Sequence, residues 1–499
     1  MIKELKLTNE KSQVDKKISY KKIESDKFDY FEISSKADSI SISYTTSRSK
    51  SYALRRLDQV GRDKIFYLKD YADIKLRGVI EGFYSIPWSN DDRLDMLSFM
   101  DQVFLNTYIY APKDDPYHNK KWREKYDEKS LKDLKKLVDL ANILDIDFVW
   151  SIHPGMNKFN FDDYDKELNT LIDKYKSLMD IGVKRFALFM DDIDRKEAYE
   201  DRDKHKKLYR DVEDFLVKND LGHLMVVLPF YNQAWVDGEA KEYFDGLRDT
   251  EIEIMWTGRE VLSPIDDESN IFFEKVSGKS PNIWLNWPVN DYMRDSIFME
   301  SFEYFNPARK KTFKSLYTNP MNQEELSKIS VAQIADYLWD MENYKVGESL
   351  KKAFTMVESN PSLYKISDSF YSSQLYKDNK NPLIEENGAI YQAFKEKDFD
   401  KLKILVKAKI KDTEDYIDKH TNKKLYEEIH IFVKNLLAIL RSIDFLLAKD
   451  KEMAEKEFEK TKEMKIWIYK EFTDKDLVER KVKHPERLVE IYEYLRSEL

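Results

Sequence analysis

The feature that most constrains the fold of this chain is a repeat of short apolar runs along residues 73–340. Eight runs occur, at residues 78–80, 103–110, 148–152, 186–190, 224–228, 252–256, 283–285 and 315–317. Runs of this kind are typical of parallel strands covered by helices on both faces. Eight strand-helix units in about 250 residues predict a (β/α)₈ TIM barrel. An open doubly wound sheet is the alternative, but no glycine-rich phosphate loop follows the first run.

The segments around the barrel predict three domains. Between the runs, helices with one charged side are expected at residues 91–100, 129–144, 166–179, 206–218 and 324–338. Residues 1–70 hold an alternation at 40–44, a helical stretch at 52–60 and an apolar run at 64–68, which predict a small α+β domain. Residues 71–341 form the predicted catalytic barrel. Residues 342–499 contain few glycines and a strong apolar stripe along 425–447, which predict a helical bundle.

The composition excludes several classes of partner and site. With 84 Lys+Arg against 94 Asp+Glu, the net charge of -10 gives no general attraction to nucleic acid or to an anionic membrane. The chain has no cysteine, so disulfides and thiolate metal sites are excluded. Its first 17 residues are charged throughout, and no stretch is apolar enough to span a membrane. We therefore expect neither a signal peptide nor a membrane span in this chain, and it could work in the cytoplasm or be secreted after removal of a signal.

The apolar run at 186–190 stops at two acids, Asp191 and Asp192. Two adjacent carboxylates at the end of a buried strand raise at least one pKa, which prepares one acid to donate a proton near neutrality. Two other interpretations stay open. One of the acids could cap the next helix, or Asp191, Asp192 and Asp194 could bind a metal ion.

Barrel enzymes place their active sites at the carboxyl ends of the strands, so the residues after each run are candidates. They are Glu81, Gly82, Lys113, His153, Asp191, Asp192, Tyr231, Trp256, Thr257, Asn286, Asp291 and Asn319. Any single one has an ordinary structural explanation, such as a solvated lysine, a satisfied histidine or a turn. Polar groups that converge beside aromatic faces such as Trp256 and Trp284 suit a neutral, hydroxyl-rich ring such as a sugar.

Six segments, taken in order, resemble the motifs of one known family. They are RGVIEGFYSIPWS at 77–89, YAPKDDPYH at 110–118, RFALFMDDI at 185–193, MWTG at 255–258, WLNWPVNDY at 284–292 and TNPMN at 318–322. Together they resemble glycoside hydrolase family 84, the β-N-acetylglucosaminidases that include protein O-GlcNAcases and bacterial enzymes often labelled hyaluronidases. The regions before and after the predicted barrel resemble that family's small α/β domain and helical bundle.

The resemblance implies a role for each acid. Asp191 would accept a hydrogen bond from the acetamide N–H of the substrate, so that the acetamide oxygen attacks C1 in place of an enzyme carboxylate. Asp192 would protonate the leaving oxygen and then deprotonate the incoming water. This implies an exo-acting, retaining β-N-acetylglucosaminidase that passes through an oxazoline intermediate and needs no metal or organic cofactor.

The resemblance also implies a set of substrate-binding residues. The backbone of Gly82 would meet a ring hydroxyl, since a side chain there would block the sugar. Hydrogen bonds to the hydroxyls and the acetamide rim would come from Lys113, Asn286, Asp291 and Asn319. Tyr231 would bond the acetamide oxygen, and the acetamide pocket would be walled by Tyr84, Thr257 and Trp284.

The expected partner is a glycan that contains N-acetylglucosamine or a protein that carries O-GlcNAc. Two departures from the family pattern, Ser85 for a glycine and Phe230 for a polar residue, bear on the choice of leaving group. Two other functions stay open: a weakly catalytic protein that binds N-acetylglucosamine glycans on the same fold, and a hyaluronidase-type hydrolase of glycosaminoglycans.

Overall fold

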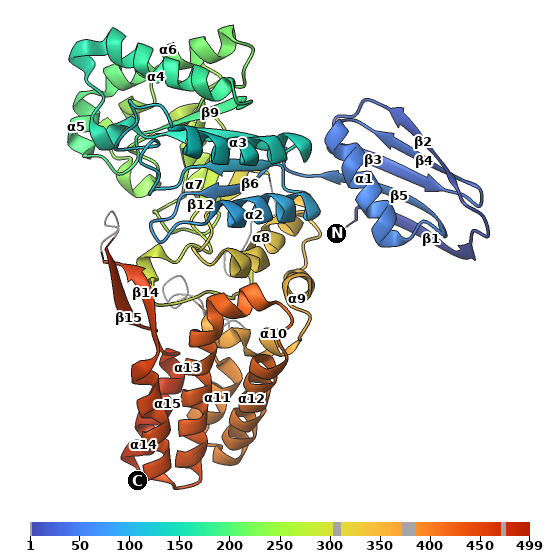
Figure 1. Cartoon of the computed structure of the whole chain (residues 1–499), viewed down its shortest axis with the longest axis vertical. Helices are drawn as coiled ribbons and strands as arrows, with labels where there is room; N and C mark the ends of the chain where they lie inside the picture. Colours follow the sequence, from blue (N-terminus) through green and yellow to red (C-terminus); the bar gives the residue numbers. More distant parts are fainter. Residues whose placement is uncertain (1, 303–310, 372–385, 471–475) are drawn as a thin grey trace.

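The computed structural model describes residues 2–302, 311–371, 386–470 and 476–499. A closed eight-stranded barrel occupies one end of the molecule, with a five-stranded sheet beside it and a set of long helices below it (Figure 1). Along these four described ranges, no helix is both long enough and apolar enough to cross a membrane.

The barrel confirms the predicted fold class. Its parallel strands are β6 (Leu76–Glu81), β7 (Thr107–Tyr110), β8 (Asp147–Ile152), β9 (Arg185–Phe189), β10 (Met225–Val227), β11 (Glu253–Trp256), β12 (Asn282–Leu285) and β13 (Ser315–Thr318). Each strand overlaps one of the eight predicted runs. The ring closes where β13 pairs in parallel with β6, so the alternative of an open sheet is wrong.

Helices surround the barrel and bury the outer faces of its strands. They are α2 (Asn90–Gln102), α3 (Glu128–Ile143), α4 (Tyr164–Met179), α5 (Arg195–Glu200), α6 (Arg202–Lys218), α7 (Asp267–Ser277) and α8 (Glu324–Trp339). Side chains from alternate strand positions, including Ile109, Val149, Phe189 and Met225, fill the interior. The barrel is therefore a packed core, and space for a ligand exists only at its ends.

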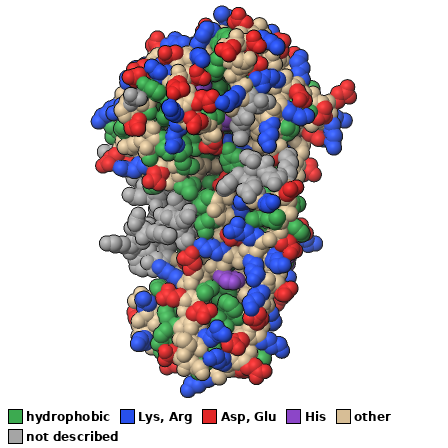
Figure 2. All heavy atoms as spheres, turned by 90° about the vertical axis from the view of Figure 1, so that its left-hand side faces the viewer, with side chains coloured by type: hydrophobic (Ala, Val, Ile, Leu, Met, Phe, Trp, Pro, Cys, Tyr) green, Lys and Arg blue, Asp and Glu red, His purple; other side chains and the backbone are tan. Residues whose placement is uncertain are grey.

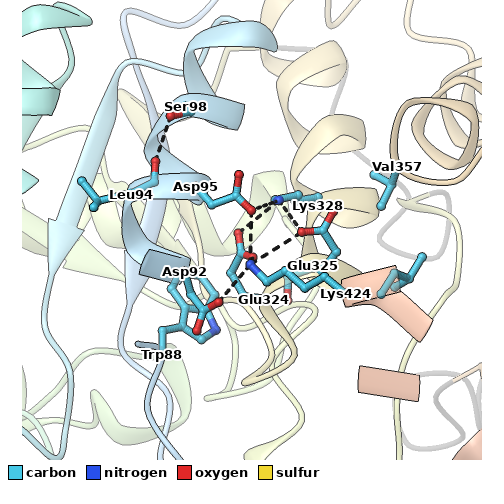
Figure 3. Close-up of polar contacts among 12 residues, drawn as sticks. Trp88, Asp92, Leu94, Asp95, Ser98, Glu324, Glu325, Lys328, Val357 and Lys424 are labelled. Carbon is cyan, nitrogen blue, oxygen red and sulfur yellow. Dashed lines mark hydrogen bonds and ion pairs between the residues drawn. The ribbon is translucent and has the colours of Figure 1, made fainter. Parts of the chain in front are cut away.

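Helix α8 differs from the prediction of one solvated, charged side. Every one of its residues is buried, because α8 packs against α2, α9 (Val346–Val357) and α13 (Lys423–Leu447). The charges of its first two turns, Glu324, Glu325 and Lys328, pair with Asp95 and Lys424 in what we call the barrel–bundle cluster (Figure 3). Lys328 Nζ lies 2.7 Å from Asp95 and 2.5 Å from Glu325, and Lys424 Nζ lies 2.5 Å from Glu324.

The N-terminal region is the predicted small α+β unit, with more strands than predicted. Helix α1 (Ser47–Val60) covers a sheet of order β1-β5-β3-β4-β2, made of β1 (Glu4–Lys11), β2 (Lys17–Lys22), β3 (Phe28–Ser35), β4 (Ser39–Tyr44) and β5 (Lys64–Ala72). Its core includes Phe104 and Trp339 of the barrel region. Buried Arg77 of β6 donates to Asp29 Oδ2 at 2.8 Å, which further joins the sheet to the barrel.

The C-terminal region is mainly helical, as predicted. Beyond α9 it contains α10 (Ser362–Ile366), α11 (Gly388–Lys395), α12 (Phe399–Lys419), α13, α14 (Lys451–Glu459) and α15 (Glu486–Ser497). The apolar stripe of α13 is buried, as the bundle prediction required. A hairpin of β14 (Lys465–Tyr469) and β15 (Leu477–Lys481) was not predicted, since both strands are short and β15 is mostly charged and exposed. The division into domains at residues 70 and 341 stays a proposal.

Candidate active site

A cavity of about 510 Å³ opens at the carboxyl ends of the barrel strands. Its volume is in the usual range for small-molecule sites. All eleven residues assigned from the sequence to catalysis or substrate binding line it, and they come from seven of the eight strand ends: Gly82, Tyr84, Lys113, Asp191, Asp192, Tyr231, Thr257, Trp284, Asn286, Asp291 and Asn319. On the face shown in Figure 2, hydrophobic side chains gather between two charge-covered parts of the molecule.

The two acids after β9 have different surroundings. Asp191 is buried, with a relative exposure of 5%, whereas Asp192 is exposed. Asp192 also has a φ of 57°, in the left-handed region that non-glycine residues rarely adopt. Because the chain turns sharply between them, consecutive side chains reach different partners.

The carboxylate of Asp191 is held by two basic side chains. Lys113 Nζ donates to its Oδ2 at 2.8 Å, and His153 Nε2 lies 3.2 Å from its Oδ1. Burial alone would raise the pKa of Asp191, but Lys113 and His153 outweigh it and hold that pKa well below its usual range. The rise predicted for one acid of the pair therefore does not fall on Asp191, which stays ionised.

The carboxylate of Asp192 accepts hydrogen bonds from two tyrosines. Tyr84 Oη donates to Oδ2 at 2.7 Å, and Tyr231 Oη donates to Oδ1 at 2.9 Å. Burial raises the pKa of both phenols, and the nearby charge of Asp192 raises it further. Both hydroxyls therefore keep their protons and can act as donors to Asp192 or to a ligand.

A chain of amide hydrogen bonds forms the opposite wall. Asn319 Oδ1 accepts from the backbone N–H of Gly82 at 3.2 Å, and its Nδ2 donates to Asn286 Oδ1 at 3.0 Å. That oxygen also accepts from Trp284 Nε1 at 2.8 Å. The indole and both amides are thus fixed in orientation before any ligand binds.

The structure explains the need for a glycine at position 82 differently from the prediction. A Cβ built on Gly82 would lie 2.4 Å from the Trp284 ring, so the missing side chain makes room for this tryptophan rather than directly for a ligand. The Trp256 side chain lies in the outer core, where its indole donates to Ser269 at 3.2 Å. Both tryptophans proposed as aromatic faces are among the residues that line the cavity, and Trp284 also packs with the interior of the barrel.

The remaining predicted residues bind neighbouring backbone. Asp291 Oδ2 accepts from the N–H of Tyr84 at 2.9 Å, and burial raises the pKa of Asp291. Thr257 Oγ1 donates to the carbonyl of Glu260 at 2.8 Å. Asp194, a ligand in the metal alternative, instead caps helix α5, where its Oδ1 accepts from the N–H of Glu197 at 2.8 Å. Asp194 is therefore engaged in capping a helix, and the structure does not favour a metal site built from Asp191, Asp192 and Asp194.

The sequence from residue 77 to residue 370, more than half of the chain, matches the family model described as beta-N-acetylglucosaminidase (NAGidase). The chain belongs to this family, glycoside hydrolase family 84. Its matched segment contains every residue described above that lines the cavity.

Two kinds of relative agree with the family 84 assignment. The protein O-GlcNAcase of Rattus norvegicus is 28% identical over 307 residues, which are 58% of this chain and 32% of that protein. The match thus spans about a third of that relative. Among solved structures, CpGH84D has a TM-score of 0.82 and 26% identity, covering 94% of this chain and 84% of that chain. A variant of the Thermobaculum terrenum O-GlcNAc hydrolase has a TM-score of 0.71 and 22% identity, covering 85% and 94%, and supports the fold.

Sequence reasoning missed part of the site of this family 84 protein. Val261, Leu262, Val289 and Tyr292 also line the cavity, from loops after β11 and β12 that carry no periodic pattern. His153 was noticed at the end of β8 but was not assigned to the site. Its position after an apolar run was the available signal, and its contact with Asp191 could be seen only in the folded chain.

Proposed function

We propose that this family 84 protein is an exo-acting, retaining β-N-acetylglucosaminidase that removes terminal β-linked N-acetylglucosamine from glycans or from O-GlcNAc-modified protein. The observation that carries the proposal is the unequal environment of the two neighbouring acids. One is buried and held ionised by Lys113 and His153, and the other is exposed and bonded to two tyrosine hydroxyls. These are the properties required of an orienting anion and of a proton carrier.

Asp191 is proposed to orient the acetamide of the substrate. Its Oδ2 accepts from Lys113 at 2.8 Å, whereas its Oδ1 has only the longer 3.2 Å contact with His153 Nε2, which lies closer to the carbonyl of Asp191. An amide N–H donated to Oδ1 would satisfy this buried oxygen. The same bond would leave the acetamide oxygen beside C1 of the sugar, where it attacks as an intramolecular nucleophile and forms an oxazoline.

Asp192 is proposed as the general acid and then the general base. It would give a proton to the leaving oxygen as the bond to C1 breaks, and take one from water when the oxazoline opens. Its exposure at the mouth of the cavity allows a leaving group and later a water molecule to approach it. Two displacements at C1 retain the configuration of the sugar.

The other residues are proposed to bind the ring. Tyr231 would move its hydrogen bond from Asp192 to the acetamide oxygen, and the acetamide pocket would be walled by Tyr84, Thr257 and Trp284. The backbone of Gly82 and the side chains of Lys113, Asn286, Asp291 and Asn319 would bond the hydroxyls and the acetamide rim. The convergence of these side chains on one cavity of about 510 Å³ supports an exo mode of attack, in which a terminal sugar enters.

Substrate assistance is tested with aryl N-acylglucosaminides in which the acetyl group carries zero, one, two or three fluorines. Fluorine withdraws electrons from the amide oxygen, so kcat/KM is expected to fall steeply with each fluorine added. The inhibition constant of each matching free sugar serves as the control for binding. Turnover with a flat series would contradict attack by the acetamide. If the parent compound is not hydrolysed at all, the proposed hydrolase activity is contradicted, and the alternative of a sugar-binding protein remains.

A further inference from the structure

The peptide that joins the two acids precedes an uncommon backbone conformation. Its carbonyl oxygen belongs to Asp191, and the residue that follows it, Asp192, has a φ of 57°. Aspartate adopts this left-handed region more readily than most residues, but the conformation is still uncommon, and surrounding contacts help to hold it. The contacts that fix this peptide therefore also fix where both carboxylates point.

One side chain contacts both the backbone and the carboxylate of Asp191. His153, which is fully buried, has its Nε2 2.8 Å from the carbonyl oxygen of Asp191 and 3.2 Å from Oδ1 of the same residue. Both neighbours are acceptors, so Nε2 must carry the hydrogen. The bond to the carbonyl sets the plane of the Asp191–Asp192 peptide, and that plane directs Asp192 towards Tyr84 and Tyr231.

The segment after His153 supports the same peptide from a second direction. A Cβ built on Gly155 would lie 2.8 Å from Cγ2 of Ile193 and 3.2 Å from Sδ of Met190. These two residues flank the acid pair in sequence. The loop that carries His153 is thus packed directly against the turn, with no room for even one methyl group.

We infer that His153 is a positioning residue for the proposed hydrolysis: it holds the left-handed turn between Asp191 and Asp192, and through that turn it aims both acids. The inference rests on the proposed function. His153 makes no contact with the proposed substrate and acts through the acid pair. The lowered pKa of Asp191 agrees with this role, because Lys113 and His153 together outweigh the burial that would raise it.

A neighbouring histidine provides a matched control. His118 is also fully buried, and its ring centroid lies 6.2 Å from that of His153. Its Nδ1 bonds the carbonyl of Ser151 at 2.9 Å, and none of its hydrogen bonds reaches either acid. Leucine at position 118 or 153 therefore removes a buried imidazole from the same layer, but only the change at 153 releases the turn.

The test measures kcat, KM and the pH profile of kcat/KM on an aryl N-acetylglucosaminide for His153→Leu, His153→Gln and His118→Leu. For His153→Leu we expect kcat to fall about 100-fold, as for a small misplacement of catalytic groups, while KM changes far less. The acid limb of the pH profile of His153→Leu should move to higher pH, because Asp191 loses a partner that lowers its pKa. His153→Gln keeps an N–H donor and should recover at least part of both effects.

The acid limb reports on Asp191 only if its surroundings are otherwise intact. The titratable groups around Asp191 are Lys113, His153, Asp192, Tyr84, His118, Tyr209 and Tyr231. His118→Leu changes one of these without touching the turn, and it should leave the acid limb and kcat nearly unchanged even where it lowers the unfolding temperature.

Three outcomes would overturn the inference while the parent enzyme stays active. The first is a folded His153→Leu with normal kcat and acid limb, and the second is an equal loss in His118→Leu. If His153→Leu does not fold, Gly155→Ala is measured in its place and is expected to lower kcat more than it changes KM. The third outcome that would overturn the inference is an unchanged kcat in Gly155→Ala. An inactive parent enzyme would instead overturn the proposed function.

Discussion

Two groups of charged residues in this molecule each contain one buried carboxyl group, and the pKa values of these two carboxyl groups are shifted in opposite directions. In the active site, one carboxylate, Asp191, has both Lys113 and His153 beside it. In the barrel–bundle cluster, Lys328 and Lys424 are shared among several carboxyls, with Asp92 also 2.9 Å from Lys424. Asp191 and Glu324 are both buried, yet the pKa of Asp191 is lowered and burial raises the pKa of Glu324 to about 8.

The comparison shows that burial by itself does not decide whether a carboxyl group is charged. The cations beside it matter as well: Asp191 has Lys113 and His153, whereas Glu324 shares Lys328 and Lys424 with Asp95 and Glu325. The candidate active site thus keeps an ionised carboxylate at Asp191. In the barrel–bundle cluster, Glu324 has a pKa raised to about 8 and lies on α8, which packs against α2 and α13, so its protonation is linked to this packing.

Lys113→Met should have the largest effect. It leaves Asp191 buried without its closest cation, so its pKa should rise and kcat/KM should fall by about 10³-fold, as when a buried charge loses its partner. The acid limb of the pH profile should move to higher pH, since the anion now forms only at higher pH. Steady-state kinetics across pH measure both effects. An acid limb that does not move would contradict the proposed control of Asp191 by Lys113.

Lys328→Met makes the same chemical change in the other group. It should destabilise the fold by about 3 kcal/mol, at the low end for a broken buried ion pair because its partner Asp95 is partly exposed. The active site is elsewhere, so kcat/KM should stay within about two-fold, well under the factor of ten that 1.4 kcal/mol represents. Denaturant unfolding and kinetics on the same sample separate the two effects. A large loss of activity in the folded variant would show that the two groups are coupled.

Glu324→Gln should have a smaller effect, visible only against pH. The pKa of Glu324 is raised in the folded state from its ordinary 4.5 to about 8, so its contribution to stability is complete below pH 4.5 and is lost as pH rises through 8. Removing this one proton should flatten the fall in unfolding free energy between pH 5 and 8 by at most about 1.4 kcal/mol per pH unit. Glu428, with a pKa raised to about 7 by burial, keeps part of the dependence. Equal slopes for both proteins would contradict the assignment.

The barrel could be predicted from the sequence because each of its strands is buried on both faces and appears as an apolar run. Strands β1, β2, β14 and β15 could not, since they are mostly exposed and carry no clear alternation. The burial of α8 depends on the C-terminal helices that cover its charged residues, and these contacts join segments about 100 residues apart.

The site was predictable in its polar residues and not in its electrostatics. The acids, Lys113 and the asparagines follow apolar runs, so a barrel brings them together. The low pKa of Asp191 depends on Lys113, 78 residues away in sequence, whereas the sequence argument considered only the neighbouring acid. The role inferred for His153 depends on the left-handed backbone conformation of Asp192, which no sequence pattern predicts.

The central claim is that two consecutive aspartates do different work, and leaving-group dependence tests it most directly. Asp191→Asn and Asp192→Asn are compared on an aryl and an alkyl N-acetylglucosaminide. Asp192→Asn should lose about 100-fold more activity on the alkyl glycoside, whose leaving oxygen needs a proton, than on the aryl one. Asp191→Asn should lose activity equally on both. An equal loss on both substrates for Asp192→Asn would contradict the account.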